Sequence, residues 1–185
     1  MEKKIFLGGL GGQGVVMGGK LIGSAAVMDG KFATNYAEYA PAMRNGYTYT
    51  TLMIADEEVG AQVSACYDCM AFFDERSCVT QKESLKDKGV YILNSSLVET
   101  MPDESKGTIY QIPASNIADE LGNAKLLNVI MMGAIIEATD CVDMASLEKV
   151  ISATFGKSPK IVKLNLEALK KGASIVVAAR EGRAE

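Results

Sequence analysis

Residues 6–19 of the chain read FLGGLGGQGVVMGG, and this stretch decides the fold. A short apolar strand at residues 4–8 runs into a cluster of glycines, and residues 14–28 continue as a helix rich in Gly, Ala and Ser. Glycine permits a positive φ and a close approach of a ligand to the backbone, and the first N–H groups of a helix have no partner within it. The segment predicts a strand, a tight turn and a helix start that together form a cradle for the phosphates of a cofactor.

The turn satisfies the G-x-G-x-x-G pattern from Gly9 to Gly14, in the strand-to-helix context that the pattern requires. Tight packing of a strand on a helix can also demand glycines, so the motif alone leaves two interpretations open. A dinucleotide fold needs an acidic residue about 20 positions further on. Residues 33–36 read ATNY, which disfavours NAD. A Walker-type loop can be drawn over residues 14–20, but Leu21 replaces the magnesium-binding Ser or Thr and Lys20 would lie inside the helix, which disfavours a nucleoside triphosphatase.

Beyond this segment, strands alternate with helices. We expect strands at residues 32–35, 48–54, 69–73, 90–93 and 108–112, an exposed loop at 36–47, a polar helix at 74–88, a short helix after Pro113, a buried helix at 126–138 and an amphipathic helix capped by Asp143. This alternation predicts a three-layer α/β/α sandwich with a largely parallel, or mixed, Rossmann-like sheet. We expect residues 1–185 to form a single domain.

The composition is that of a globular protein. A net charge of −4 argues against a general affinity for nucleic acid or for an anionic membrane. The N-terminal apolar run breaks into glycines too early for a signal peptide, and residues 126–138 are too few to span a bilayer. The absence of histidine excludes histidine-based triads and His-containing zinc sites. We therefore expect a cytoplasmic protein that binds neither nucleic acid nor membrane.

Four cysteines could suggest a metal or redox site. Cys66 and Cys69 form a C-x-x-C pair, but Cys78 and Cys141 do not supply the second close pair of a structural zinc site. The spacing also matches neither common ferredoxin pattern. We interpret all four as buried structural thiols.

A second informative segment, residues 35–51, reads NYAEYAPAMRNGYTYTT. Asn45 and Gly46 suit a turn, so Arg44 can project its guanidinium group from a loop. Arginine matches phosphate in a bidentate manner. A solvated surface arginine is the alternative, but the loop lies between strands, at the sheet end predicted for the glycine turn, so we expect a shared ligand site.

Together these segments resemble the gamma subunit, or gamma domain, of the 2-oxoacid:ferredoxin (acceptor) oxidoreductases. The resemblance rests on residues 9–15, GLGGQGV, on residues 39–46, YAPAMRNG, leading into Thr48-Tyr49-Thr50, and on residues 128–133 with Asn165, Ala168 and Gly172. It implies a component of a complex that converts a 2-oxoacid and coenzyme A to acyl-CoA and CO2. Thiamine diphosphate, Mg²⁺ and iron–sulfur clusters are then expected on the alpha, beta and ferredoxin-like delta subunits, with a ferredoxin-type acceptor, and coenzyme A on this chain.

The resemblance implies a site without catalytic residues or a metal. The coenzyme A phosphates would be lined by Gly9, Gly11, Gly12, Gln13, Gly14 and Val15, and closed in by Arg44 and Gly46. Two residues depart from the gamma pattern, because Ala42 stands where an acid is common and Asn45 where glycine is preferred. The alternative hypothesis is a stand-alone module that binds coenzyme A or a nucleotide without catalytic partners. The sequence leaves open whether the acid is 2-oxoglutarate, pyruvate, or a branched-chain or aryl 2-oxoacid.

Overall fold

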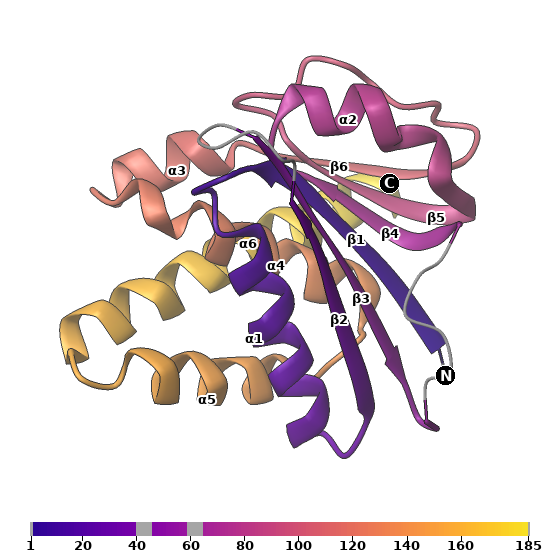
Figure 1. The fold of residues 1–185 in the computed structure, drawn as a ribbon. Coiled ribbons are helices and arrows are strands. Elements are labelled where there is room, and N and C mark those ends of the chain that lie inside the picture. The colour runs from indigo at the N-terminus through magenta and orange to yellow at the C-terminus, as the bar shows by residue number, and fades with distance from the viewer. Residues whose placement is uncertain (1, 40–45, 59–64, 185) are drawn as a thin grey trace.

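The structure is a computed structural model that describes residues 2–39, 46–58 and 65–184. One mixed sheet lies between two layers of helices (Figure 1). Its strands stand in the order β2-β3-β1-β4-β5-β6, with the bounds β1 (Glu2–Leu10), β2 (Phe32–Tyr39), β3 (Tyr47–Ala55), β4 (Tyr67–Phe72), β5 (Leu85–Asn94) and β6 (Gly107–Ile112). The predicted α/β/α sandwich is thereby confirmed.

The strand order places the glycine turn where ligands bind in open α/β sheets. β1, β4, β5 and β6 run parallel, whereas β3 lies antiparallel between β1 and β2. From β1 the chain moves to one side, to β2 and β3, and then crosses to β4 on the other side. The turn at the carboxyl end of β1 is therefore at the topological switch point of the sheet.

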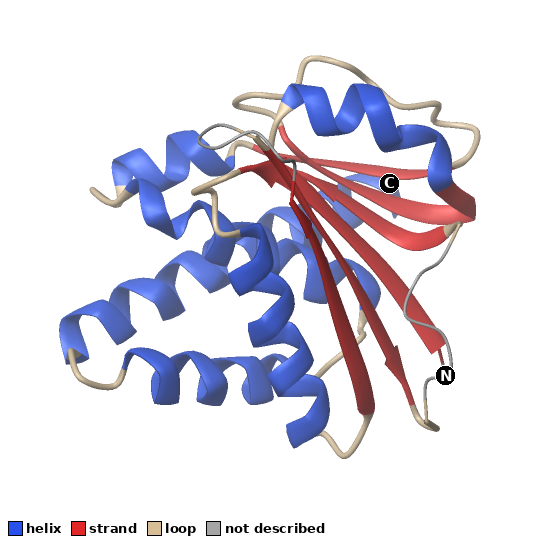
Figure 2. Ribbon diagram, in the orientation of Figure 1, coloured by secondary structure: helices blue, strands red, loops and turns tan. Residues whose placement is uncertain are grey.

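The two helical layers are unequal (Figure 2). One face carries α1 (Val15–Met28), α3 (Ala114–Glu120), α4 (Leu127–Thr139), α5 (Met144–Phe155) and α6 (Pro159–Ala184), with the 3-10 turn η2 (Ala124–Leu126) before α4. The other face carries α2 (Glu75–Gln81) and the 3-10 turn η1 (Lys82–Ser84). Each face has its own hydrophobic core, and the larger core surrounds α4, whose residues are nearly all buried.

Two glycines allow α4 and α6 to pack with their backbones in contact. A Cβ on Gly133 would collide with the carbonyl oxygen of Leu169, and a Cβ on Gly172 with that of Ile130. Both glycines belong to the family pattern recognised in the sequence. They allow the close packing of α6 on α4, and α4 in turn contacts the glycine turn through Asn128.

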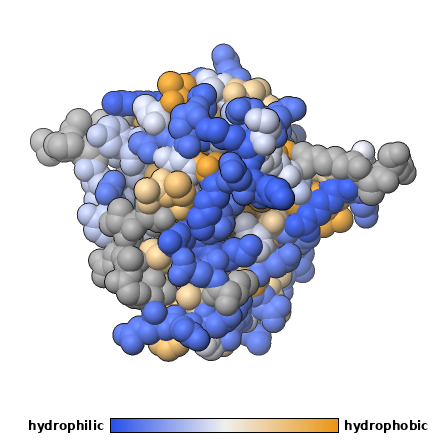
Figure 3. Space-filling model, turned by 90° about the vertical axis from the view of Figure 1, so that its right-hand side faces the viewer, coloured by the Kyte–Doolittle hydropathy of each residue, from blue (hydrophilic) through white to orange (hydrophobic). Residues whose placement is uncertain are grey.

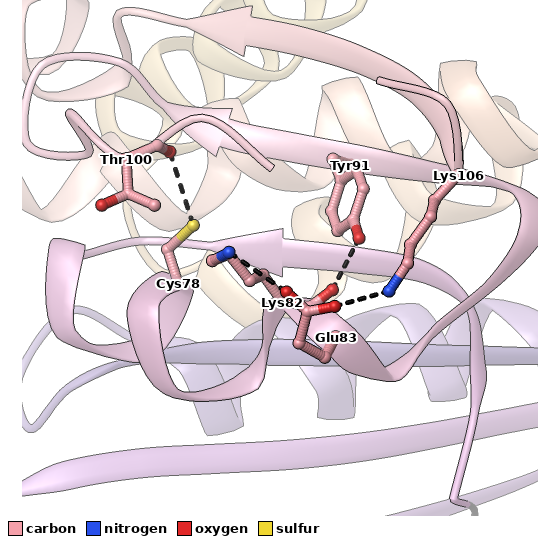
Figure 4. A network of polar contacts seen from close by, with 6 residues as sticks. All are labelled: Cys78, Lys82, Glu83, Tyr91, Thr100 and Lys106. Atoms are coloured by element: carbon pink, nitrogen blue, oxygen red, sulfur yellow. Dashed lines mark hydrogen bonds and ion pairs between the residues drawn. The ribbon is translucent and has the colours of Figure 1, made fainter. Parts of the chain in front are cut away.

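The predicted helix over residues 74–88 is too long, because α2 ends at Gln81 and β5 begins at Leu85. The Tyr91 hydroxyl donates to the Lys82 carbonyl at 2.6 Å, and Glu83 pairs with Lys82 and Lys106, which fixes η1 (Figure 4). Leu85 is then buried in the smaller core. Tertiary contacts with β5 and with the chain before β6 thus end the helix at Gln81, although the polar residues that follow favour a helix locally.

The predicted loop at 36–47 is also partly wrong, since β2 continues to Tyr39 and pairs with β3 as far as Thr48. β2 is an edge strand whose residues are mostly exposed or half-buried. An exposed strand shows no alternation of apolar and polar residues, so its end is not visible in the sequence.

Surface features agree with the composition. The side of the molecule that lies on the right of Figure 1 is mostly hydrophilic over its described residues, with hydrophobic residues scattered singly (Figure 3). None of the helices in the described part of the chain combines the length and the apolar character that a bilayer-spanning segment needs.

Candidate functional site: the glycine turn and its two cavities

The turn between β1 and α1 is clamped by Gln13. The Gln13 N–H donates to the Leu10 carbonyl at 3.1 Å, and the side-chain Oε1 accepts from the Leu10 N–H at 2.7 Å. Its Nε2 donates to the Phe73 carbonyl at 3.3 Å, at the end of β4. The Gln13 amide therefore ties the turn to two adjacent parallel strands and holds it in one conformation.

Two positions of the turn require glycine for its backbone. Gly12 has φ 99° and Gly14 has φ 79°, both in the left-handed region. A Cβ on Gly12 would meet no atom within 4 Å, so this residue faces open space. A Cβ on Gly14 would lie 2.6 Å from Nδ2 of Asn128, so Gly14 also provides room for the start of α4.

The first turn of α1 presents unused hydrogen-bond donors. The N–H groups of Gly14, Val15 and Val16 have no acceptor among the described residues. No side chain among the described residues caps this helix, and no acidic residue stands in its first turn to neutralise the dipole. A helix start of this kind, behind a glycine turn, favours a bound anion such as phosphate.

The predicted site residues contribute in different ways. Gly11 donates its N–H to the Gly46 carbonyl at 3.0 Å, so the two predicted segments meet at this point. Gly9 packs against Phe73, where a Cβ would lie 2.8 Å from the Phe73 Cβ. The Val15 side chain is buried, which leaves its backbone for a ligand. Arg44 lies outside the described residues.

Two cavities flank the turn, and both are bordered by Gly12, Gln13 and Lys125. The larger has a volume of about 500 Å³ and lies between the starts of α1, α4 and α6 and the end of α5. The smaller, about 260 Å³, lies on the α3 side. A still larger groove of about 800 Å³ runs along α6 from Pro159 to Ser174, but none of the turn residues borders it.

Lys125 is a residue of the site that the sequence did not reveal. It stands in η2, and its ammonium group has no ion pair with a described residue. Lys20, the lysine of the rejected Walker pattern, lies in α1, as expected, and borders a separate cavity. A lone lysine in a turn carries no pattern, so only the fold brings Lys125 to the glycine turn.

A second cation stands at the same end of the sheet, on the α2 face. The Arg76 guanidinium carbon lies 5.0 Å from the centre of the Tyr47 ring, and Tyr47 directly follows Gly46. Asp74 caps α2 by accepting from the backbone N–H groups of Arg76 and Ser77. Arg76 is thus held on the aromatic ring of Tyr47, next in the chain to Gly46, which contacts the turn.

The four cysteines differ in their burial. Cys69, Cys78 and Cys141 are buried, as predicted, whereas Cys66 is exposed, so the prediction is wrong for that residue. Burial raises the pKa of the Cys78 thiol to about 12 and also raises the pKa values of Cys69 and Cys141. Within the described residues, no group of three or more His, Cys, Asp or Glu side chains could hold a metal ion.

Comparisons with known proteins identify the family. The sequence profile described as pyruvate ferredoxin/flavodoxin oxidoreductase matches residues 4–175. The 2-oxoglutarate synthase subunit KorC of Methanocaldococcus jannaschii is 32% identical over 93% of this chain and 92% of that protein. The ketoisovalerate oxidoreductase subunit VorA of Methanothermobacter marburgensis is 27% identical over 93% of this chain and 36% of VorA.

Solved structures share the fold. The gamma subunit of a keto/oxoacid ferredoxin oxidoreductase from Geobacter sulfurreducens has a TM-score of 0.81 and 25% identity, over 95% of this chain and 99% of that one. The 2-oxoglutarate:ferredoxin oxidoreductase from Magnetococcus marinus, solved with 2-oxoglutarate, coenzyme A and succinyl-CoA bound, has a TM-score of 0.87 and 24% identity over 96% of this chain. This chain spans only 31% of the Magnetococcus chain. From the family profile and the relatives together, we conclude that the chain belongs to the pyruvate ferredoxin/flavodoxin oxidoreductase family, in which it corresponds to the gamma subunit.

Proposed function

We propose that this chain is the coenzyme A-holding subunit of a thiamine-diphosphate-dependent 2-oxoacid:ferredoxin oxidoreductase, which converts a 2-oxoacid and coenzyme A to acyl-CoA and CO2. The observation that carries the proposal is the row of unused N–H groups at Gly14, Val15 and Val16, behind a turn that only glycine can form. A diphosphate on this turn would accept from these donors and pair with Lys125, so the residues fit the phosphates of coenzyme A.

Three further facts support coenzyme A over NAD or ATP. In a dinucleotide fold the second strand lies directly beside the first and carries the ribose-binding acid, but here the antiparallel β3 separates β2 from β1. Lys20 borders a different cavity and cannot serve as a Walker lysine at the turn. The Magnetococcus relative was solved with coenzyme A bound.

In this proposal the chain binds and orients coenzyme A and carries no catalytic step. Thiamine diphosphate with Mg²⁺ supplies the carbon chemistry when bound to the alpha and beta subunits, and iron–sulfur clusters pass electrons through a delta subunit to a ferredoxin-type acceptor. The turn residues offer N–H donors and one ammonium group, which suit an anchor for an anion. We propose Arg44, which the sequence places two residues before Gly46, as a further phosphate contact.

Calorimetry of the purified full chain with coenzyme A tests the binding. Replacing Lys125 by methionine removes one charge beside the turn, and we expect roughly tenfold weaker binding. Lys20→Met is the matched control, since this exposed lysine lies on the same side of the sheet but borders another cavity. Equal affinity of the wild type and Lys125→Met would contradict the role of Lys125, and a loss confined to Lys20→Met would favour the Walker interpretation.

Co-purification tests the complex. A tagged chain isolated from its native cells should bring down thiamine-binding subunits in stoichiometric amounts. If the chain binds coenzyme A but no such subunit accompanies it, the stand-alone binding module is the correct interpretation.

A further inference from the structure

The sheet ends on one side at β2, and the outer edge of this strand is open. β2 is the outermost strand, and among the described residues it pairs only with β3 (Figure 1). An edge strand presents a row of backbone N–H and C=O groups to which a further strand can pair. Free edges are usually protected by lysine or proline, by a bulge, or by a short strand. β2 has 8 residues, contains neither lysine nor proline, and pairs with β3 without a shift in register.

Two exposed aromatic side chains stand in a row along this edge. Successive residues of a strand point to opposite faces of the sheet. A Cβ on Gly23 of α1 would lie 3.9 Å from the Cβ of Ala33, so Ala33 faces α1 and its even-numbered neighbours face the other side. On that side Phe32 and Tyr36 are 49% and 40% exposed, with Thr34 between them.

Thr34 has a hydrogen-bonding group that the chain itself does not satisfy. Its hydroxyl oxygen is buried, and it is the one buried side-chain nitrogen or oxygen atom of the described residues without a hydrogen-bond partner. Leaving a buried hydroxyl unpaired is costly. A strand added at the open edge would bring an opposite side chain close enough to pair with it, because the Cβ atoms of directly opposed residues are about 4.5–5.5 Å apart.

A groove accompanies the open edge on the α1 side of the sheet. It has a volume of about 460 Å³ and is lined by residues of both α1 and β2. From α1 it is bordered by Lys20, Ser24 and Val27, and the Val27 side chain is 62% exposed. A strand that carries a helix on the same face would cover the edge and the groove together. The chain contains such a unit in α1 and β2 themselves.

The residues of β2 are complementary to a second, antiparallel copy of β2. Directly opposed residues point to the same face, so a two-fold pairing of identical strands places one residue opposite its own copy. With Thr34 at this position, Phe32 lies opposite Tyr36 of the second copy, and the two Thr34 hydroxyls meet. Aromatic pairs and Thr–Thr hydrogen bonds are stabilising cross-strand contacts. Glu38 lies opposite Gly30 of the second copy, so like charges do not oppose each other.

The two neighbouring registers fit less well. With Asn35 at the axis, Phe32 would lie opposite Glu38, which sets a carboxylate against an apolar ring. With Tyr36 at the axis, Phe32 would have no opposite residue within β2. The register centred on Thr34 pairs both aromatic side chains and both hydroxyls.

We propose that β2 is a dimer interface, at which two copies of this chain join their sheets antiparallel across a two-fold axis that passes between the two Thr34 residues. The dimer covers Phe32 and Tyr36 and gives each Thr34 hydroxyl a partner. The two grooves between α1 and β2 then face each other, with Val27 of each copy available to fill them. This interface is separate from the glycine turn and does not depend on the proposed binding of coenzyme A.

Disulfide trapping tests both the dimer and its register. In a Cys66→Ser background, which removes the exposed thiol, Thr34→Cys places two thiols opposite each other at a separation that a disulfide can span. We expect mild oxidation of the full chain to give a covalent dimer on non-reducing electrophoresis. Glu38→Cys in the same background is the matched control, because its two thiols would be about 26 Å apart along the paired strands. Equal cross-linking of the two variants would overturn the proposed pairing.

Sedimentation equilibrium of the unmodified full chain measures the dimer directly. We expect the mass to rise with concentration from 19.7 kDa toward twice that value. Tyr36→Lys removes an aromatic partner and places a lysine on the edge, and it should weaken dimerisation roughly tenfold or more. Leu97→Lys, at a side chain 46% exposed that follows β5, is the matched control and should leave dimerisation unchanged. Phe32→Lys serves as the second variant if Tyr36→Lys does not fold.

The alternatives give different results. A wild-type chain that stays monomeric at every concentration would overturn the proposal, as would a dimer that Tyr36→Lys and Leu97→Lys leave equally stable. If the backbone amides of β2 gain protection from hydrogen exchange only when another subunit of the complex is added, the edge belongs to that subunit, and the proposal is wrong. A dimer that only the β2 variants weaken, together with selective cross-linking through Thr34→Cys, would support it.

Discussion

Replacing Gly14 by alanine tests how the turn is built. Gly14 is the N-cap of α1, with φ 79° and ψ 18°, and its carbonyl accepts from Asn128 at 3.5 Å. An added Cβ would lie 2.6 Å from the Asn128 Nδ2, which is closer than real Cβ contacts come. Either the Asn128 amide or the start of α4 must move.

The size of the effect follows from two contributions. Forcing alanine into the left-handed region costs about 1–2 kcal/mol. Displacing the nearly buried Asn128 amide loses a hydrogen bond, which adds about 0.5–1.5 kcal/mol. We therefore expect Gly14→Ala to lower the free energy of unfolding by about 2–3 kcal/mol. In Gly12→Ala only the backbone contribution applies, because a Cβ there meets no atom within 4 Å.

Urea denaturation followed by circular dichroism measures these values, since the chain has no tryptophan. In the double variant Gly14→Ala/Asn128→Ala, the Asn128 amide that the added methyl group would strike is absent. It should be more stable than the sum of the single variants by about 1 kcal/mol. Strict additivity would show that Asn128 does not pack against Gly14, and the structural basis of the turn given above would then be wrong.

Three further predictions concern the scaffold. Gly172→Ala should prevent stable packing of α6 on α4, because the added Cβ would collide with the Ile130 carbonyl. A melting temperature within a few degrees of the wild type would contradict this close contact. Burial raises the pKa of the Cys78 thiol to about 12, so iodoacetamide at neutral pH should alkylate this thiol only after unfolding. Mass spectrometry measures the labelling, and rapid alkylation of Cys78 in the native chain would argue against its burial. Hydrogen bonds from the Thr100 hydroxyl and nearby backbone lower the pKa of Glu75. The ionised form therefore stabilises the fold above the unfolded pKa of about 4.3, and this contribution is lost as the pH falls through the lower folded pKa. Glu75→Gln should reduce the free energy of unfolding at neutral pH by less than about 1 kcal/mol, because the carboxylate is near the surface. It should also weaken the loss of stability at acid pH when the free energy of unfolding is measured against pH. An unchanged loss at acid pH would show that Glu75 does not cause it.

The sequence predicted the strand, turn and helix of residues 6–19 well because each signal there is local. Gly12 and Gly14 have the positive φ that glycine permits, and α1 begins where the motif ends. The alternation of strands and helices also predicted the layers correctly. The antiparallel β3 was left open, because a β-branched segment such as residues 48–54 reads the same in either direction.

What the sequence missed depends on contacts between distant segments. Nothing around Lys125 indicates an anion site, and only the packing of η2 and α4 against the turn brings it there. Asn128 and Asn165 belonged to the family pattern without a role. The structure shows that both border the larger cavity beside the turn, which is visible only when α4 and α6 are placed side by side.

The most direct test of the central claim is an NMR titration of the isotope-labelled full chain with coenzyme A. If the glycine turn holds the phosphates, the backbone amide signals of Gly12, Gly14, Val15 and Val16 should move first and furthest, because phosphate oxygens accept hydrogen bonds from these groups. Signals along the outer groove of α6 should stay in place. Saturable shifts on α6 with an unchanged turn would contradict the claim that the glycine turn is the coenzyme A site.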